Sequence, residues 1–304
     1  ERERFLEFDL TRLVFELSNQ RRPVVGVMSP LPLNGDPRMM MMMRGSPQAQ
    51  PYAVMQTLRQ FYTVQDVPLD AQRIADEIQV LVVAHPQNLP DATQYAIDQF
   101  VMRGGKLIVF VDPHSEGQAM RPGPGGQPNT RTASSLDRLL TAWGVEAPSD
   151  QVVLDLRGAW RVRANPTDRV QAVDYVAWFN MQGDSISQAE VATAQLNQVT
   201  VASSGILRRR EGASIEFVPL LTSSERSMMA AVDRVKENAA PARILAEFRP
   251  DGQRRVIAAR VRGELASAFP DGAPPPPEGA ERPENFPAHR ARSEGPANLV
   301  VVAD

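Results

Sequence analysis

The sequence predicts an α/β fold, a three-layer sandwich whose central sheet is mostly parallel, with a smaller mixed α+β subdomain. Two short stretches, 80–84 and 106–111, are largely apolar, which is typical of parallel strands covered on both faces. Between them, residues 91–103 have apolar side chains at helical spacing and run into Gly104 and Gly105, a common helix end. Such alternation of strands and helices indicates parallel strands joined by right-handed crossovers.

The other elements of residues 1–156 complete the predicted sandwich domain. Its helices carry apolar residues three and four positions apart, and its strands are short apolar runs bounded by Pro, Gly or polar residues. In order, they are a helix at 4–18, a strand at 24–28, a helix at 52–61, a strand at 62–67, a short helix after Asp70, a helix at 134–143 and a strand at 152–156. We expect these strands to form one sheet.

The second half has a different pattern, and residues 157–269 predict a mixed, more antiparallel subdomain. Its expected strands are 170–178, 199–201, 215–221, 243–248 and 255–262, with a hairpin turn at Asp251-Gly252. Residues 270–297 are rich in Pro and charged residues, so we expect a flexible segment there. Residues 298–304 are predicted to return to the main sheet as a strand.

Composition excludes several classes of function. The 304 residues carry a net charge of −3, so no overall positive field attracts nucleic acid. The chain has no Cys, which excludes disulfides, Cys-based metal sites and a Cys nucleophile. No run approaches the roughly 20 apolar residues that span a bilayer. The chain opens without Met and stops at a strand, so we expect a fragment whose membrane segments lie outside it.

Four stretches resemble one known family: 79–86, 95–113, 139–145 and 298–304. The most specific is the Ile97-Asp98-Gln99-Phe100 helix, which runs through two glycines into a strand and Asp112. These stretches are similar to the GldG-like family, the auxiliary components of gliding-motility-type ABC transporters.

The resemblance implies a setting for the protein. Members have an extracytoplasmic (periplasmic) domain held by membrane helices, and they work beside an ABC permease and an ATPase. Their fold is related to class I glutamine amidotransferase-like domains, which places the α/β sandwich among flavodoxin-like folds. Helix 4–18 then follows a membrane anchor. The resemblance identifies no transported substrate.

The sequence lacks the motifs of the enzymes that it most nearly suggests. Amidotransferases of this fold class need a Cys nucleophile, and a Ser replacement needs a Gly-x-Ser-x-Gly turn. Ser203-Ser204-Gly205 lacks the first Gly and is typical of an ordinary turn. There is no Gly-x-x-x-x-Gly-Lys-Ser/Thr loop, so the chain is not the ATPase itself. We therefore predict no enzymatic activity and no cofactor.

The predicted ligand-binding residues are Ser29, His85, Asp112 and His114, which all follow predicted strands. Open α/β sheets bind ligands at the carboxyl ends of their strands. If the strands are neighbours, His85, Asp112 and His114 converge and suit a polar ligand or a metal. The alternative is that they are loop residues with local turn bonds, and we predict no metal site.

Three hypotheses follow. The first is a non-catalytic binding or coupling module whose contact surfaces include these strand ends and the loops 34–51 and 115–133, the former with the run Met39–Met43. The second is a hydrolase that uses His85 and Asp112, which requires Ser29 within hydrogen-bond reach of His85. The third is a structural scaffold with no pocket at the strand ends.

Overall fold

The computed structural model describes residues 6, 10, 14, 22–35, 50–121, 123, 126–163, 172–236, 240–276, 282 and 286–304. Of the helix predicted at 4–18, Leu6, Leu10 and Val14 are described; all three are helical and exposed. The run Met39–Met43 lies outside the described residues. Within the described part of the chain, no helix is both long enough and apolar enough to cross a membrane.

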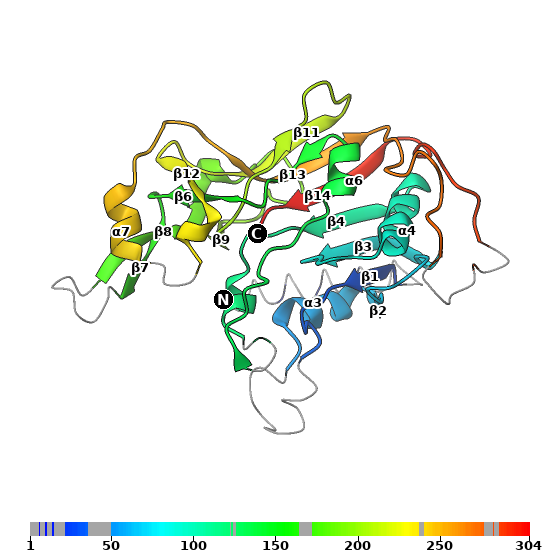
Figure 1. Ribbon diagram of the computed structural model, residues 1–304, viewed down its shortest axis with the longest axis horizontal. Helices are drawn as coiled ribbons and strands as arrows, with labels where there is room; N and C mark the ends of the chain where they lie inside the picture. Colours follow the sequence, from blue (N-terminus) through cyan, green and yellow to red (C-terminus); the bar gives the residue numbers. More distant parts are fainter. Residues whose placement is uncertain are drawn as a thin grey trace.

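A seven-stranded sheet forms the centre of the fold (Figure 1). Its order is β2 (Thr63–Asp66), β1 (Val24–Met28), β3 (Ile78–Ala84), β4 (Lys106–Phe110), β14 (Ala297–Val302), β13 (Val256–Gly263) and β11 (Glu216–Thr222). The first five strands pair in parallel, and the last two pairings are antiparallel. The predicted α/β class with a mostly parallel sheet is confirmed.

Helices cover both faces of the parallel strands. Helix α3 (Ala53–Phe61) packs its buried Met55 on Val25 and Val27 of β1. Helices α4 (Asp91–Met102) and α6 (Asp137–Ala142) cover the opposite face, where Trp143 is fully buried in the largest apolar core. These contacts remove the apolar side of each helix from water, which is what stabilises such short helices.

A second layer of strands covers another part of the sheet face on which α3 packs. It contains the antiparallel sheet of β7 (Ala159–Arg163), β8 (Ala172–Gln182) and β9 (Gln198–Ala202), and the pair of β6 (Gln151–Asp155) with β12 (Ser227–Ala231). Phe179 and Val201 of this layer pack in one core with Ile257 of β13 and Val302 of β14. In Figure 1 this layer lies to the left of the central sheet.

Several smaller elements complete the described part of the fold. They are the short helices α5 (Glu116–Ala119) and α7 (Pro241–Glu247), the pair of β5 (Val145–Glu146) with β10 (Arg208–Arg209), and the single 3-10 turns Gly183–Ser185 and Val232–Arg234.

Several predicted elements were wrong. Residues 243–248 were predicted as a strand but lie mostly in α7, because Pro241 suits a first helical turn and Ala, Arg, Leu and Glu favour helix. Asp251-Gly252 therefore joins a helix to β13 instead of closing a hairpin. The short helix after Asp70 is absent, and Ile78 begins β3 instead.

The sheet also takes its strands from unexpected parts of the chain. The strand predicted at 152–156 is β6, which pairs with β12 and not with the central sheet. Strands β11 and β13, which the sequence placed in the smaller subdomain, extend the central sheet. The strand predicted to return to the main sheet at 298–304 is β14, which lies beside β4 with Leu299 and Val301 aligned with Leu107 and Val109.

Described parts of the Pro-rich segment 270–297 lie against α4, although the sequence predicted a flexible segment. The rings of Phe286 and His289 stack on Tyr95. The Gln99 side chain accepts a hydrogen bond from the Arg290 N–H (2.7 Å) and donates one to the Arg290 carbonyl (3.0 Å). Aromatic contacts and paired amide bonds thus hold a segment that composition alone suggests is loose.

Replacing Gly158, in the turn between β6 and β7, tests how closely the second layer is packed. Gly158 has φ +79°, and a Cβ there would lie 2.2 Å from the Asn180 carbonyl oxygen. Gly212 has a similar φ of +75° but open space around it. We expect Gly212→Ala to lower the free energy of unfolding by about 1 kcal/mol and Gly158→Ala by roughly 2–4 kcal/mol, measured by urea unfolding. Equal losses would contradict the close approach.

Candidate functional site

An open hollow lies where the order of the parallel strands reverses. The chain passes from β1 to β2 on one side and then crosses back to β3 on the other side of β1. The carboxyl ends of β1 and β3 therefore form the topological switch point at which α/β sheets bind ligands. The hollow has a volume of about 380 Å³, and we call it the switch-point groove. Its lining residues are Val27, Leu31, Leu33, Val54, Met55, Leu58, Val82, Ala84, His85, Phe110, Asp112, Ser115 and Asp304.

The switch-point groove is mostly apolar because the sheet is incompletely covered there. The register places Ala84, Phe110 and Val302 in one row across the face that α3 and the second layer share. All three residues are partly buried; Val302 packs against the second layer, whereas Ala84 and Phe110 line the groove. On α3, Val54 is 55% exposed at the groove wall. Two separate covers therefore leave apolar sheet surface open between them.

His85 lies at the end of β3 in an uncommon backbone conformation, with φ +57°. Its N–H donates to the Phe110 carbonyl (2.9 Å), and its Nε2 lies 3.0 Å from Oε1 of Gln118. Burial lowers the pKa of His85, and the hydrogen bond with Gln118 opposes that shift only in part. The imidazole is therefore mainly neutral at pH 7, a polar wall and not a positive charge.

Two carboxyl groups lie at the ends of neighbouring strands. Because Val302 aligns with Phe110, Asp304 and Asp112 each follow their strand by two residues and meet at the same edge of the sheet. Asp112 Oδ1 accepts from the His114 N–H (2.8 Å), and Asp304 Oδ1 accepts from the Ala202 N–H (2.9 Å). Neither carboxylate forms an ion pair with an Arg or Lys among the described residues.

The two carboxyl groups are hard to ionise together. Burial, followed by the charge of Asp304, raises the pKa of Asp112 to about 8. Burial likewise raises the pKa of Asp304 to about 7, against the Ala202 hydrogen bond and with help from Glu116. Since interacting acids titrate as a pair, the pair retains a proton near pH 7.

Glu116 connects the groove side of α5 to the second layer. Its Oε1 accepts from the Trp178 indole N–H of β8 (2.9 Å) and from the Ser203 hydroxyl just after β9 (2.6 Å). Its Oε2 lies 3.7 Å from Nε2 of His114. Because Ser115 lines the groove and Glu116 follows it, one short helix contacts both the groove and the second layer.

The structure brings two of the four predicted site residues together. His85 and Asp112 line the switch-point groove. His114 is buried with Nδ1 2.8 Å from the Thr132 hydroxyl, and it does not line the groove. The Ser29 hydroxyl accepts from the Leu31 N–H (3.1 Å), and no hydrogen bond joins it to His85.

Sequence reasoning missed Asp304 and Glu116. Asp304 follows a strand that was predicted to rejoin the sheet, so the rule that selected Asp112 applied to it as well. Glu116 lies within 115–133, which the sequence predicted as a loop, and no sequence pattern marks it. In the described residues, no group of three His, Cys, Asp or Glu side chains is arranged to hold a metal ion.

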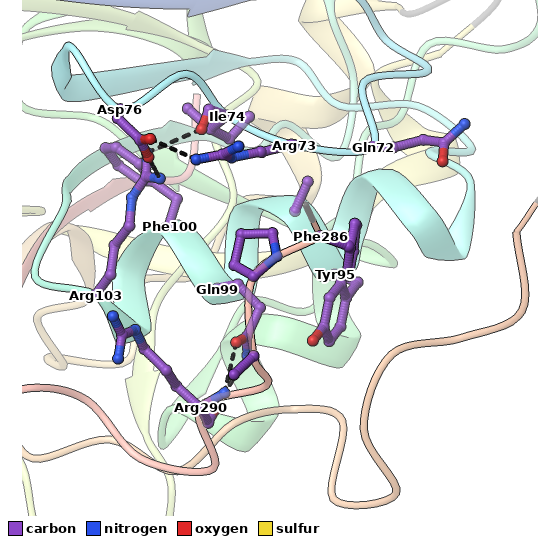
Figure 2. Close-up of a pocket in the computed structure, with 13 residues that line it drawn as sticks. Gln72, Arg73, Ile74, Asp76, Tyr95, Gln99, Phe100, Arg103, Phe286 and Arg290 are labelled. Atoms are coloured by element: carbon purple, nitrogen blue, oxygen red, sulfur yellow. Dashed lines mark hydrogen bonds and ion pairs between the residues drawn. The ribbon is translucent and has the colours of Figure 1, made fainter. Parts of the chain in front are cut away.

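A second cavity, of about 280 Å³, lies between α4, the 72–76 loop and the Pro-rich segment (Figure 2). Its arginines are engaged in structural contacts. Arg103 donates to the Ile74 carbonyl (2.9 Å) and the Ala75 carbonyl (2.8 Å), and both Arg73 and Arg103 pair with Asp76. We therefore interpret this cavity as structural: the contacts around it hold the 72–76 loop and the Pro-rich segment against α4.

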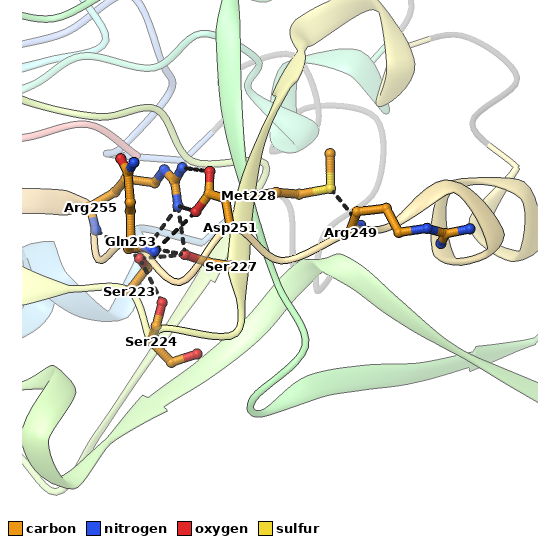
Figure 3. A network of polar contacts seen from close by, with 8 residues as sticks. All are labelled: Ser223, Ser224, Ser227, Met228, Arg249, Asp251, Gln253 and Arg255. Atoms are coloured by element: carbon orange, nitrogen blue, oxygen red, sulfur yellow. Dashed lines mark hydrogen bonds and ion pairs between the residues drawn. The ribbon is translucent and has the colours of Figure 1, made fainter.

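A cluster of polar side chains lies where β11 ends, within β12 and just before β13 (Figure 3). Arg255 pairs with Asp251 and donates to the Ser227 hydroxyl (3.1 Å), and the Ser223 and Ser227 hydroxyls lie 3.0 Å apart. The buried Asp155 accepts from both the N–H and the hydroxyl of Ser224 (2.6 Å each). Since each of these groups has a partner, the cluster satisfies buried polar atoms of the turn and suggests no ligand.

Asp112→Asn tests the buried acid pair through stability. The folded pKa exceeds the ordinary value of 3.8, so the folded protein binds more protons than the unfolded chain between about pH 4 and pH 8. The free energy of unfolding of the unmodified protein therefore falls as pH rises through that window. We expect Asp112→Asn to be near neutral at about pH 5 and to stabilise by on the order of 2–4 kcal/mol at about pH 9. A pH-independent difference in chemical unfolding would contradict this.

Two substitutions at Glu116 test its connecting role. Glu116→Gln retains an acceptor for Trp178 and Ser203, whereas Glu116→Ala removes it. We expect the Ala variant to lose roughly 1–3 kcal/mol of stability and the Gln variant less, because unpaired buried donors are costly. Hydrogen exchange should quicken at 198–205 in the Ala variant only. Equal exchange in the two variants would show that Glu116 does not hold β9.

Comparison with known families assigns the chain to one of them. The family model described as "ABC-type uncharacterized transport system" matches residues 22–304. No curated protein matches the sequence significantly. The family match runs from β1 to β14, so it includes every strand of the central sheet and every residue of the switch-point groove. The chain belongs to this family of ABC transport auxiliary proteins and is an accessory component of an ABC transporter.

Proposed function

We propose that the chain is a non-catalytic binding and coupling module, the periplasmic part of an ABC transporter of the gliding-motility auxiliary type. The observation that carries the proposal is the switch-point groove, an apolar hollow with a few polar groups at the strand ends. Ligand sites commonly combine these features, and their volumes start at about 300 Å³. The membrane setting and the permease and ATPase partners come from the family resemblance.

The hydrolase alternative requires an activated nucleophile, and neither Ser29 nor Ser203 is placed to serve as one. Ser29 and His85 are each hydrogen-bonded to other groups, Leu31 and Gln118. Ser203 follows a strand with φ +57°, but it is fully buried and donates to the Glu116 carboxylate instead of to a histidine. Activation of a Ser needs an adjacent base that accepts its proton and is itself held in place.

The scaffold alternative predicts no hollow at the strand ends, so the groove argues against it. The groove is also connected to the second layer through hydrogen bonds. Ser115 lines it, and the neighbouring Glu116 holds Trp178 and Ser203 of the second layer. A ligand that moves α5 therefore acts directly on β8 and β9, which gives binding a way to alter a surface that faces a partner subunit.

Co-purification from membranes tests the proposal. We expect the full-length protein to retain an ABC permease and ATPase after mild detergent extraction, and to change the rate of ATP hydrolysis by the complex. Val54→Arg should reduce that change severalfold, because it places a charge at the groove wall without disturbing buried contacts.

Val191→Arg is the matched control, because Val191 is 96% exposed and lies outside the groove. It should leave both assembly and ATP hydrolysis unchanged. If the complex never forms, or if the two Arg variants behave alike, the proposed function is wrong.

A further inference from the structure

We propose that the switch-point groove binds an apolar small molecule that carries one ammonium group, with Asp112 and Asp304 as the ammonium-binding residues. The inference rests on the proposed function, since it names the ligand class of the same groove.

Asp112 and Asp304 are two acidic groups that no described Arg or Lys side chain pairs with. Each of the two carboxyl groups receives one backbone hydrogen bond on Oδ1, and Oδ2 of neither accepts from another described residue. In the same region Glu116 adds a third carboxylate, whereas His85 and His114 have pKa values lowered by burial and supply no positive charge at pH 7. Two neighbouring buried carboxyl groups that pair with no cation retain a proton, and a cationic ligand group would allow both to ionise.

The rest of the groove lining is mostly apolar. Nine of the thirteen lining residues are apolar, and they come from β1, β3, β4, α3 and the loop after β1. Apolar side chains contribute no binding free energy to a bare metal ion. An aliphatic or aromatic ligand group gains about 25 cal/mol per Å² of apolar surface that it buries against them. The ligand must therefore join a cationic end to an apolar body.

The two carboxyl groups disfavour an anionic ligand in the groove. An anionic ligand would place its charge beside Asp112 and Asp304, and like charges in a buried site repel strongly. An uncharged ligand would fill the apolar part but leave both carboxyl groups as they are. A cation favours ionisation of the pair, whose pKa values burial raises.

Calorimetric titration of the purified 304-residue chain tests the proposal with three probes of similar shape. They are phenethylamine, phenethyl alcohol and phenylacetate, which differ in charge at about pH 8. We expect phenethylamine to bind at least tenfold more tightly than the alcohol, on the order expected for a charge-assisted hydrogen bond, and phenylacetate not to bind. Asp112→Asn and Asp304→Asn should each remove most of the amine's advantage and leave the alcohol unchanged.

Asp150→Asn, at an exposed carboxylate before β6, is the control and should change neither affinity. Equal binding of amine and alcohol, tighter binding of phenylacetate, or no binding of the amine would each overturn the proposal. If the amine fails while Val54→Arg still uncouples ATP hydrolysis, the ligand class is wrong and the proposed function stands. If the amine binds but no transporter complex forms, the proposed function is wrong and the ligand class stands.

Discussion

The parallel pairing of β14 with β4 is the constraint on which the rest of the structure depends. It makes the end of the chain an inner strand of the central sheet and lets β13 and β11 extend that sheet. The apolar residues of β14 alternate, with Leu299 and Val301 in the main core and Val300 and Val302 against the second layer. Register is fixed by this alternation, because a slip of one residue would exchange the two faces.

The same register fixes the chemistry of the groove. With Val302 opposite Phe110, Asp304 must lie beside Asp112, and each carboxyl group is held by a backbone N–H from a neighbouring loop. A core designed only for stability would place apolar residues or an ion pair here. Raised pKa values from burial and like charge are typical of functional sites, where stability is given up for binding.

Much of the parallel half could be predicted from sequence, because its signals are local. Continuous apolar runs marked β3 and β4, and a helical pattern ending at Gly104 marked α4. The residues after these strands, His85 and Asp112, were found by the same reasoning. The errors in strand placement depended on distant pairing. Nothing local to residues 152–156 indicates that they pair with β12, and nothing local to β11 or β13 indicates a place beside β14.

The groove residues that were missed show the same limit. Asp304 acquires its role only because β14 lies beside β4, and Glu116 only because α5 meets β8 and β9. The groove itself exists because α3 and the second layer, which are far apart in sequence, cover the same sheet face without meeting over Ala84 and Phe110. A ligand in that gap would complete the cover and contact α3, the sheet and α5 together. Binding there would therefore join the two parts of the fold through Glu116, which is the mechanical link that the proposed coupling role requires.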